Sequence, residues 1–217
     1  MSSTNMRIED AILTYCGFLV AITMREAAYA VTARQLGDRS SETESRATVN
    51  PIPHVDLLGT IILPAVFLFS GVPFLLGWAK QLTIDTRYFK KIRRDINIAE
   101  LAGPLTNFGL ALLCGVLAVS LGYRVETMMF GEDPIPRLLL AIAKSNIVIG
   151  LLNLLPFPGS SGWRLLLNNI RYQWGQSLIQ HANIISIVMI VLLLTNILSP
   201  LFMGALGLYM FVLQSIA

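Results

Sequence analysis

The sequence predicts an all-α protein that crosses a membrane several times. Of its 217 residues, 54% are hydrophobic and only 13% are charged, and the mean hydropathy is +0.65. A soluble domain carries roughly 25% charged residues. The apolar residues also come in long blocks, and a helix needs about 20 of them in succession to cross the hydrocarbon core. We expect one membrane domain, residues 1–217, and no nucleic-acid partner.

The first apolar block covers residues 11–36. The polar stretch before it lacks the pattern of a cleaved signal peptide, so we expect the block to remain as a helix. Gly37-Asp38 is a typical helix stop. A polar loop follows, with a short strand expected at residues 47–49.

The second block, residues 57–79, contains no charged residue, but its middle is interrupted. Pro64 and the turn signal Ser70-Gly71-Val72-Pro73 break it. Four further blocks are predicted to be transmembrane helices, which gives about five to six membrane segments in total. These blocks are residues 96–122, 138–158, 179–198 and 201–217.

Lysine and arginine are concentrated in three of the loops, which the positive-inside rule places in the cytoplasm. Their basic residues are Arg34, Arg39 and Arg46; Lys80, Arg87, Lys90, Lys91, Arg93 and Arg94; and Arg164 and Arg171. The loop over residues 123–136 is acidic and is placed outside.

The second block is flanked by basic loops on both sides. A re-entrant hairpin over residues 57–79 satisfies the charge bias, while a single full crossing against that bias remains the alternative. With re-entry, the chain crosses five times, its N-terminus lies outside and its C-terminus lies in the cytoplasm. Blocks 11–36 and 138–158 then run parallel.

Four short motifs occur in order along the chain. They are Met24-Arg25-Glu26-Ala27-Ala28-Tyr29-Ala30, Asn50-Pro51-Ile52-Pro53-His54, Leu101-Ala102-Gly103-Pro104-Leu105-Thr106-Asn107, and residues 153–164, NLLPFPGSSGWR. Together they resemble the site-2 protease (peptidase M50) family of intramembrane zinc metalloproteases, over roughly residues 14–167. The resemblance implies a site-2 protease-like helical bundle in a bacterial inner membrane.

The resemblance also shows where this sequence departs from the family. There the first motif reads H-E-x-x-H and the last ends in Asp-Gly; here Arg25 and Tyr29 stand at the histidines and Ser161 at the aspartate. Arginine has no lone pair for a metal, and tyrosine and serine are poor zinc ligands. Glu26 keeps the position of the general base. We therefore expect a lost zinc site, no cofactor, and Arg25 in place of the metal cation, paired with Glu26 or Asp56.

Residues near these motifs are candidates for a cleft that receives a partner or substrate. They are the polar residues His54, Asn146 and Asn153, together with Pro156. The resemblance implies that an asparagine here orients a bound segment. The alternatives are an interfacial histidine, asparagines that join helices within the bundle, and an improvised metal site of His54, Glu26 and Tyr29.

The sequence thus predicts a pseudoprotease that binds other integral membrane proteins through its transmembrane helices, as an accessory or assembly subunit in contact with membrane lipids. The alternative is an intramembrane metalloprotease with atypical ligands. A serine mechanism through Ser160 or Ser161 lacks a visible base. Lys144, inside an apolar block, motivates a third class of transport or lipid-handling proteins.

Overall fold

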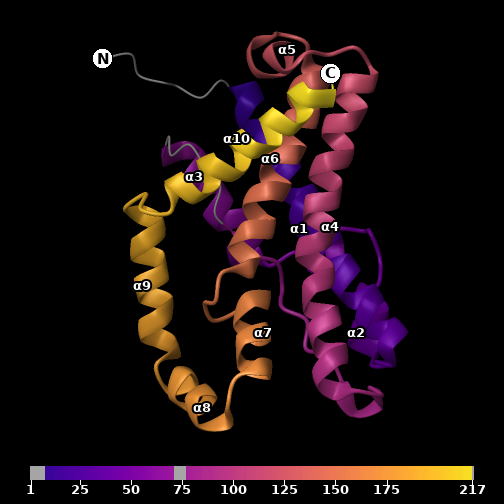
Figure 1. Cartoon of the computed structure of the whole chain (residues 1–217), viewed down its shortest axis with the longest axis vertical. Helices are drawn as coiled ribbons and strands as arrows, with labels where there is room; N and C mark the ends of the chain where they lie inside the picture. Colours follow the sequence, from indigo (N-terminus) through magenta and orange to yellow (C-terminus); the bar gives the residue numbers. More distant parts are fainter. Residues whose placement is uncertain (1–7, 71–76, 217) are drawn as a thin grey trace.

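Every regular element of the chain is a helix in a computed structural model that describes residues 8–70 and 77–216 (Figure 1). The helices are α1 Ile8–Leu36, α2 Ser41–Arg46, α3 Leu63–Ser70, α4 Ile92–Ser120, α5 Val125–Phe130, α6 Pro134–Leu154, α7 Ser161–Asn169, α8 Tyr172–Gln180, α9 Ala182–Leu194 and α10 Ser199–Ile216. Three short turns of helix are η1 Ile52–His54, η2 Leu57–Ile62 and η3 Thr86–Tyr88. The predicted all-α class is confirmed.

The prediction of a strand at residues 47–49 is wrong. This stretch forms bends after α2. A strand needs a neighbour to take its backbone hydrogen bonds, and the described ranges offer no strand beside it.

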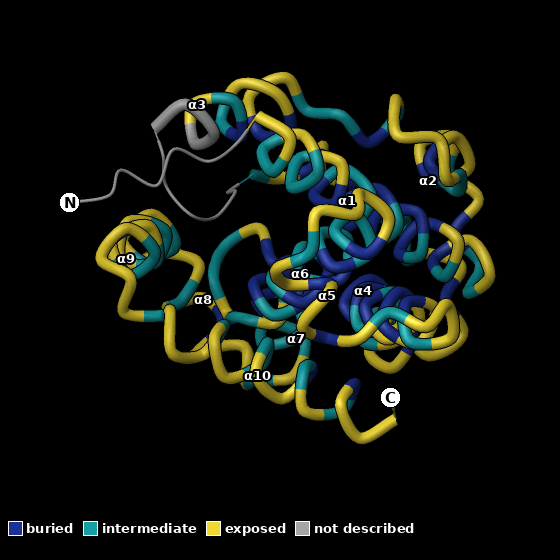
Figure 2. Tube along the Cα trace, turned by 90° about the horizontal axis from the view of Figure 1, so that it is seen from above, coloured by how far each residue is buried: buried dark blue, intermediate teal, exposed yellow. Residues whose placement is uncertain are grey.

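Helices α1, α4 and α6 pack against one another and form the centre of the molecule (Figure 2). Small residues allow this close approach. A Cβ added at Gly17 would lie 2.6 Å from the carbonyl oxygen of Ala141, and one added at Gly103 would lie 2.8 Å from Cγ of Arg25. The segment around Gly103 therefore packs closely on α1.

The ends of the central helices follow local sequence signals. Helix α1 ends at the predicted stop, where Gly37 has a φ of 123° and the Asp38 amide donates to the Ala33 carbonyl oxygen at 3.0 Å. Helix α6 begins with Pro134, and the Asp133 carboxylate accepts from the Ile135 amide at 3.0 Å.

Four described helices are long and apolar enough to cross a membrane: α1, α4, α6 and α10. The pair α8 and α9, bent by 66° at its break, gives a fifth if it counts as one span. The protein is a polytopic membrane protein, in agreement with the predicted class. The fifth predicted block, residues 179–198, is shorter as a helix than expected, because α9 ends at Leu194.

The block over residues 57–79 returns to the place where it starts. The Trp78 amide donates to the Gly59 carbonyl oxygen at 3.1 Å, and the Lys80 amide donates to the His54 carbonyl oxygen at 2.9 Å. The Thr60 hydroxyl donates to the Trp78 carbonyl oxygen at 2.9 Å. The two ends of the block therefore meet, as a re-entrant hairpin requires. Residues 71–73 of the predicted turn lie outside the described residues.

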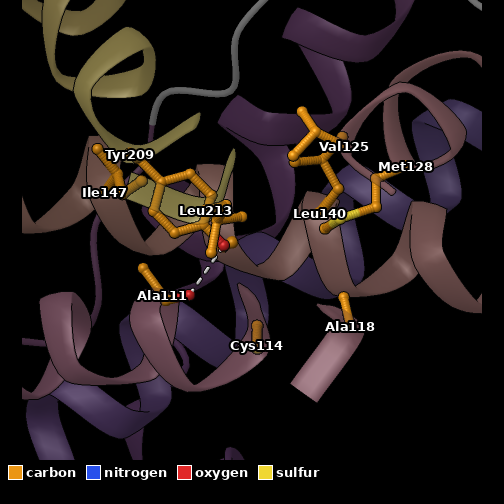
Figure 3. Close-up of a cluster of buried hydrophobic side chains, with 10 residues drawn as sticks. Ala111, Cys114, Ala118, Val125, Met128, Leu140, Ile147, Tyr209 and Leu213 are labelled. Carbon is orange, nitrogen blue, oxygen red and sulfur yellow. Dashed lines mark hydrogen bonds between the residues drawn. The ribbon is translucent and has the colours of Figure 1, made fainter. Parts of the chain in front are cut away.

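Helix α10 is held to the bundle by a buried apolar cluster (Figure 3). Leu213 is fully buried, and Tyr209 donates its hydroxyl hydrogen to the Ala111 carbonyl oxygen at 3.0 Å. The cluster also contains Ala118, Val125 and Met128. The C-terminal half of α10 is thereby fixed beside the end of α4 and beside α5.

The start of α1 lies at the same end of the bundle as α5 and the start of α6, since Arg137 is paired with Glu9 and Asp10 (Figure 1). Helix α10 runs toward that end as well. Helix α9, with 13 residues, is about 20 Å long. The side of the membrane on which each end of the chain lies stays a prediction.

Candidate functional site

The first motif, with Arg25, Glu26 and Tyr29, lies buried on one turn of α1, against α4; these three residues are called the relic motif below. Arg25, Glu26 and Tyr29 are 9%, 4% and 4% exposed. Charged side chains inside an apolar helix are costly unless they have partners. The surrounding contacts show which partners they have.

Glu26 is held by two arginines. Arg25 forms a buried ion pair with one oxygen of its carboxylate, and Nη2 of Arg46 lies 3.8 Å from the other. Arg46 is 2% exposed and also donates to the carbonyl oxygen of Gln81 at 3.0 Å. Of the two partners that the sequence offered for Arg25, the structure gives Glu26. Asp56 instead accepts from the Gly59 amide at 2.7 Å and caps η2.

Tyr29 belongs to a second buried cluster with Glu100 of α4 and Arg164 of α7. The Tyr29 hydroxyl donates to Oε1 of Glu100 at 2.9 Å, and Nε of Arg164 donates to the same oxygen at 2.6 Å. The guanidinium of Arg164 also lies over the Tyr29 ring, 5.3 Å from its centre. The two clusters join α1, α2, α4 and α7 around the relic motif.

Ser160 and Ser161 begin α7. The Ser160 hydroxyl accepts from the Trp163 amide at 3.0 Å and lies within donating distance of the carbonyl oxygens of Leu155, at 2.6 Å, and Phe157, at 2.8 Å. It acts as a helix cap. Ser161, at the position of the family's aspartate, is 2% exposed. Within the described residues, the partners of the Ser160 hydroxyl are backbone groups and include no general base.

His54 is fully buried in η1. Its Nε2 donates to the Thr48 carbonyl oxygen at 2.9 Å, while Nδ1 has no partner among the described residues. Burial lowers the pKa of His54 below 6.5, although the bond to Thr48 opposes the shift. The ring is therefore neutral at pH 7, with its proton on Nε2, because a carbonyl oxygen can only accept.

The two asparagines of α6 point their amide groups back along their own helix. Nδ2 of Asn146 donates to the Ile142 carbonyl oxygen at 2.8 Å, and Nδ2 of Asn153 donates to the Ile149 carbonyl oxygen at 2.9 Å. Asn146 is fully buried and its Oδ1 has no described partner. Asn153 is half-buried and Pro156 is exposed just after the helix end. No hydrogen bond within the described ranges joins these residues to His54.

Four residues of this region were not singled out from the sequence: Arg46, Asn107, Glu100 and Arg164. Asn107 is fully buried, and neither of its amide atoms has a described partner. Glu100 and Asn107 carried a usable signal, since both are polar residues within an apolar block. Arg46 was counted only as a loop charge, and Arg164 was counted as a loop charge and quoted as the last residue of the fourth motif, without a role of its own.

The donor set at the relic positions does not fit a zinc ion. Arg25 has no lone pair to donate, and Tyr29 is hydrogen bonded to Glu100. Across residues 8–70 and 77–216, no three side chains of His, Cys, Asp or Glu come together as a metal site.

Comparison with known proteins finds bacterial relatives. The chain is 33% identical over 149 residues to "Putative zinc metalloprotease YwhC" of Bacillus subtilis (strain 168), which covers 68% of this chain and 64% of that protein. It is 28% identical over 197 residues to "Putative zinc metalloprotease Rip2" of Mycobacterium tuberculosis (strain H37Rv), covering 89% of this chain and 71% of that protein. The match to Rip2 of Mycolicibacterium smegmatis is 27% over 191 residues, covering 88% and 70%.

The match to YwhC thus spans just under two thirds of the length of that relative. No family model matches the chain, and no solved structure matches it.

Proposed function

This chain belongs to the site-2 protease family of membrane proteins, and from that premise we propose that it is a non-catalytic member that binds other membrane proteins without cleaving them. The observation that carries the proposal is the replacement of the ligand positions by Arg25, Tyr29 and Ser161, of which the first two take part in buried networks around Glu26 and Glu100.

The contacts of Glu26 support this proposal in chemical terms. A general base in a metalloprotease takes a proton from a metal-bound water. Glu26 instead faces two guanidinium groups, from Arg25 and Arg46, so that each of its carboxylate oxygens lies in an ion pair. Arg25 supplies the positive charge that a metal ion would supply. Zinc is therefore not part of the proposed function.

Metal content tests the proposal directly. The purified wild-type chain is expected to hold far less than one zinc per molecule, and a chelator is expected to leave its thermal stability unchanged. The triple variant Arg25→His, Tyr29→His and Ser161→Asp restores the family's ligand types and is the matched comparison. The opposite result would be stoichiometric zinc in the wild type and a cleavage activity, both of which are lost when a chelator is added. It would establish an intramembrane metalloprotease with atypical ligands.

The proposed partners are integral membrane proteins that bind through their transmembrane helices. Helix α9 supports this, because none of its described side chains is buried and its sequence, ANIISIVMIVLLL, is almost wholly apolar. Lipid covers such a helix adequately, so its exposure is compatible with both a free and a partner-bound state.

Purification in a mild detergent tests the partner proposal. We expect a defined membrane complex in which partners co-migrate with this chain at fixed stoichiometry. Polar substitution of the exposed Val188 on α9, as Val188→Gln, should release the partner, whereas Leu117→Gln, on the exposed face of α4, is the control. A chain that migrates alone would contradict the accessory role.

We further propose a location in the bacterial inner membrane, with the start of α1 outside the cytoplasm. The support is the charge distribution: the loop over residues 80–95 is strongly basic, and the loop over residues 123–136 is acidic.

A further inference from the structure

A cavity of about 680 Å³ lies between α1, α5, α6, the end of α9 and the start of α10. It is separate from the relic motif, because Arg25, Glu26 and Tyr29 do not line it. It is also on a different face of α6 from Asn146 and Asn153, neither of which lines it.

The cavity changes in character from one end to the other. On α6, Arg137 and Lys144 lie seven residues apart, so they share a helix face, and Val148 and Leu152 continue that face toward the other end. On α1, Asp10 lies at the charged end of the cavity, with Arg137 and Lys144, and Phe18 lies at the apolar end. A polar end followed by an apolar passage matches an amphiphile.

Lys144 has no counter-ion among the described residues. It is half-buried, and no described carboxylate lies within ion-pair distance of its amine. The residues outside the description, 1–7, 71–76 and 217, contain no Asp or Glu side chain. Asp10, which lines the same cavity, is already hydrogen bonded to Arg137. An intramembrane lysine of this kind calls for an anionic partner.

The size of the cavity, about 680 Å³, suits a single acyl chain. A volume of this order is typical of small-molecule sites lined mainly by apolar side chains.

We propose that this cavity binds a single-chain anionic lipid, with its head group near Lys144 and its acyl chain along Phe18, Val148 and Leu152. The proposal does not depend on the loss of catalysis. The shared chemistry is one acyl chain with a negative head group, either the carboxylate of a fatty acid or the phosphate of a lysophospholipid.

Photolabelling of the full-length chain in detergent tests the proposal. The probes are a diazirine-bearing palmitic acid, its uncharged methyl ester, and a diazirine-bearing lysophosphatidylglycerol. We expect an anionic probe to label peptides of α1, α6 and α10. Stronger labelling by the fatty acid assigns a carboxylate head group, and stronger labelling by the lysophospholipid assigns a phosphate.

Substitution of Lys144 distinguishes binding that depends on the lysine charge from non-specific binding to an apolar surface. Lys144→Met is expected to weaken labelling by the anionic probe about 10-fold or more, the effect of losing a hydrogen bond to a charged group. Lys144→Arg, which keeps the charge, should be labelled as the wild type is. Lys90→Met, a control on the exposed basic loop, should also be labelled as the wild type is. Labelling of Lys144→Met by the methyl ester reports that the cavity is intact.

Two results would overturn the proposal. One is labelling of Lys144→Met by the anionic probe at the wild-type level. The other is labelling confined to peptides that do not line the cavity. Met203→Trp, which places a large ring at the lining of α10, is expected to reduce labelling by all three probes and gives an independent check on the position.

Discussion

At the scale of single residues, two buried carboxylates organise the relic site. Glu26 and Glu100 are each paired with arginine: Glu26 with Arg25 and Arg46, and Glu100 with Arg164. Removing one partner from a buried pair leaves an uncompensated charge, which is more costly than losing both partners together. The arginines are therefore as important for stability as any apolar core residue.

Substitution of Arg25 tests this directly. Arg25→Met keeps the length of the side chain and removes its charge, which leaves Glu26 with Arg46 alone at 3.8 Å. We expect a loss of about 3 kcal/mol in the free energy of unfolding, near the lower end of the range for broken buried pairs. Equilibrium unfolding in mixed micelles measures it.

The double variant Arg25→Met and Glu26→Gln is the matched control. Its loss should be clearly smaller than the sum of the two single losses, because the charges of residues 25 and 26 are removed together and Arg46 keeps Glu42 at 3.8 Å. Additive losses would show that the two side chains are not coupled.

A second residue-scale prediction concerns pH and His54. Its pKa is lowered in the folded chain below the usual 6.5, so the unfolded chain binds more protons at slightly acid pH. The stability associated with neutral His54 is complete above pH 6.5 and declines as the pH falls from there toward the folded pKa. Thermal unfolding between pH 5 and 8 should show this decline, and His54→Gln should reduce it. Equal pH profiles would refute the assignment.

The sequence supplied the identity of the altered motif but not its partners. Arg25, Glu26 and Tyr29 could be assigned from their spacing and resemblance. The partners of Glu26 and Tyr29 could not, because Arg46 and Arg164 reach the site only through long-range packing of α2 and α7. Long side chains in polar segments give no local sign of whether they point to water or inward.

At the scale of elements, the base of the hairpin over residues 57–79 depends on two glycines. A Cβ added at Gly59 would lie 2.4 Å from ring atoms of Trp78, and one added at Gly77 would lie 2.5 Å from Cζ of Phe18. Glycine therefore lets the two ends of the hairpin meet and lets them contact α1.

Gly59→Ala is expected to destabilise the fold by about 1–3 kcal/mol, because an indole ring cannot yield as a flexible chain can. The matched control is Gly109→Ala on α4, where no neighbouring atom lies within 4 Å of the added Cβ. The control should be neutral or slightly stabilising, since alanine is the better helix former. Thermal unfolding of both variants in the same detergent compares them, and equal melting temperatures would argue against the tight base.

The long elements were predictable because apolar blocks and breakers are local signals. The stop at Gly37 agrees with the observed end of α1, whereas α6 ends at Leu154, before the end of the predicted block 138–158. The elbow between α9 and α10 lies a few residues before the break predicted between blocks 179–198 and 201–217. It contains Asn196, with a φ of 57°, and no proline or glycine marks that position in the sequence.

At the scale of the whole molecule, charge separates the two ends of the bundle. Arg93 at the start of α4 donates to backbone oxygens of Asn168 and Asn169 at the basic end. Glu9, Asp10 and the acidic loop after α5 lie at the other end. The apolar packing of Leu213 places the end of α10 at this acidic end, which charge counting could not reveal because the last helices carry no charged residue.

Cysteine accessibility tests this arrangement. In a Cys16→Ser background, which retains only the buried Cys114, single cysteines replace three exposed residues: Glu132, Lys90 and Ser215. A membrane-impermeant maleimide applied to spheroplasts should label Glu132→Cys and Ser215→Cys, and should label Lys90→Cys only after permeabilisation. The reverse pattern for all three would invert the orientation but keep α10 in place. Ser215→Cys behaving like Lys90→Cys would instead mean that α10 ends at the basic side, and the packing of Leu213 against Ala118 and Met128 would have to be abandoned. The comparison separates the two arrangements because Ser215 lies only two residues from Leu213.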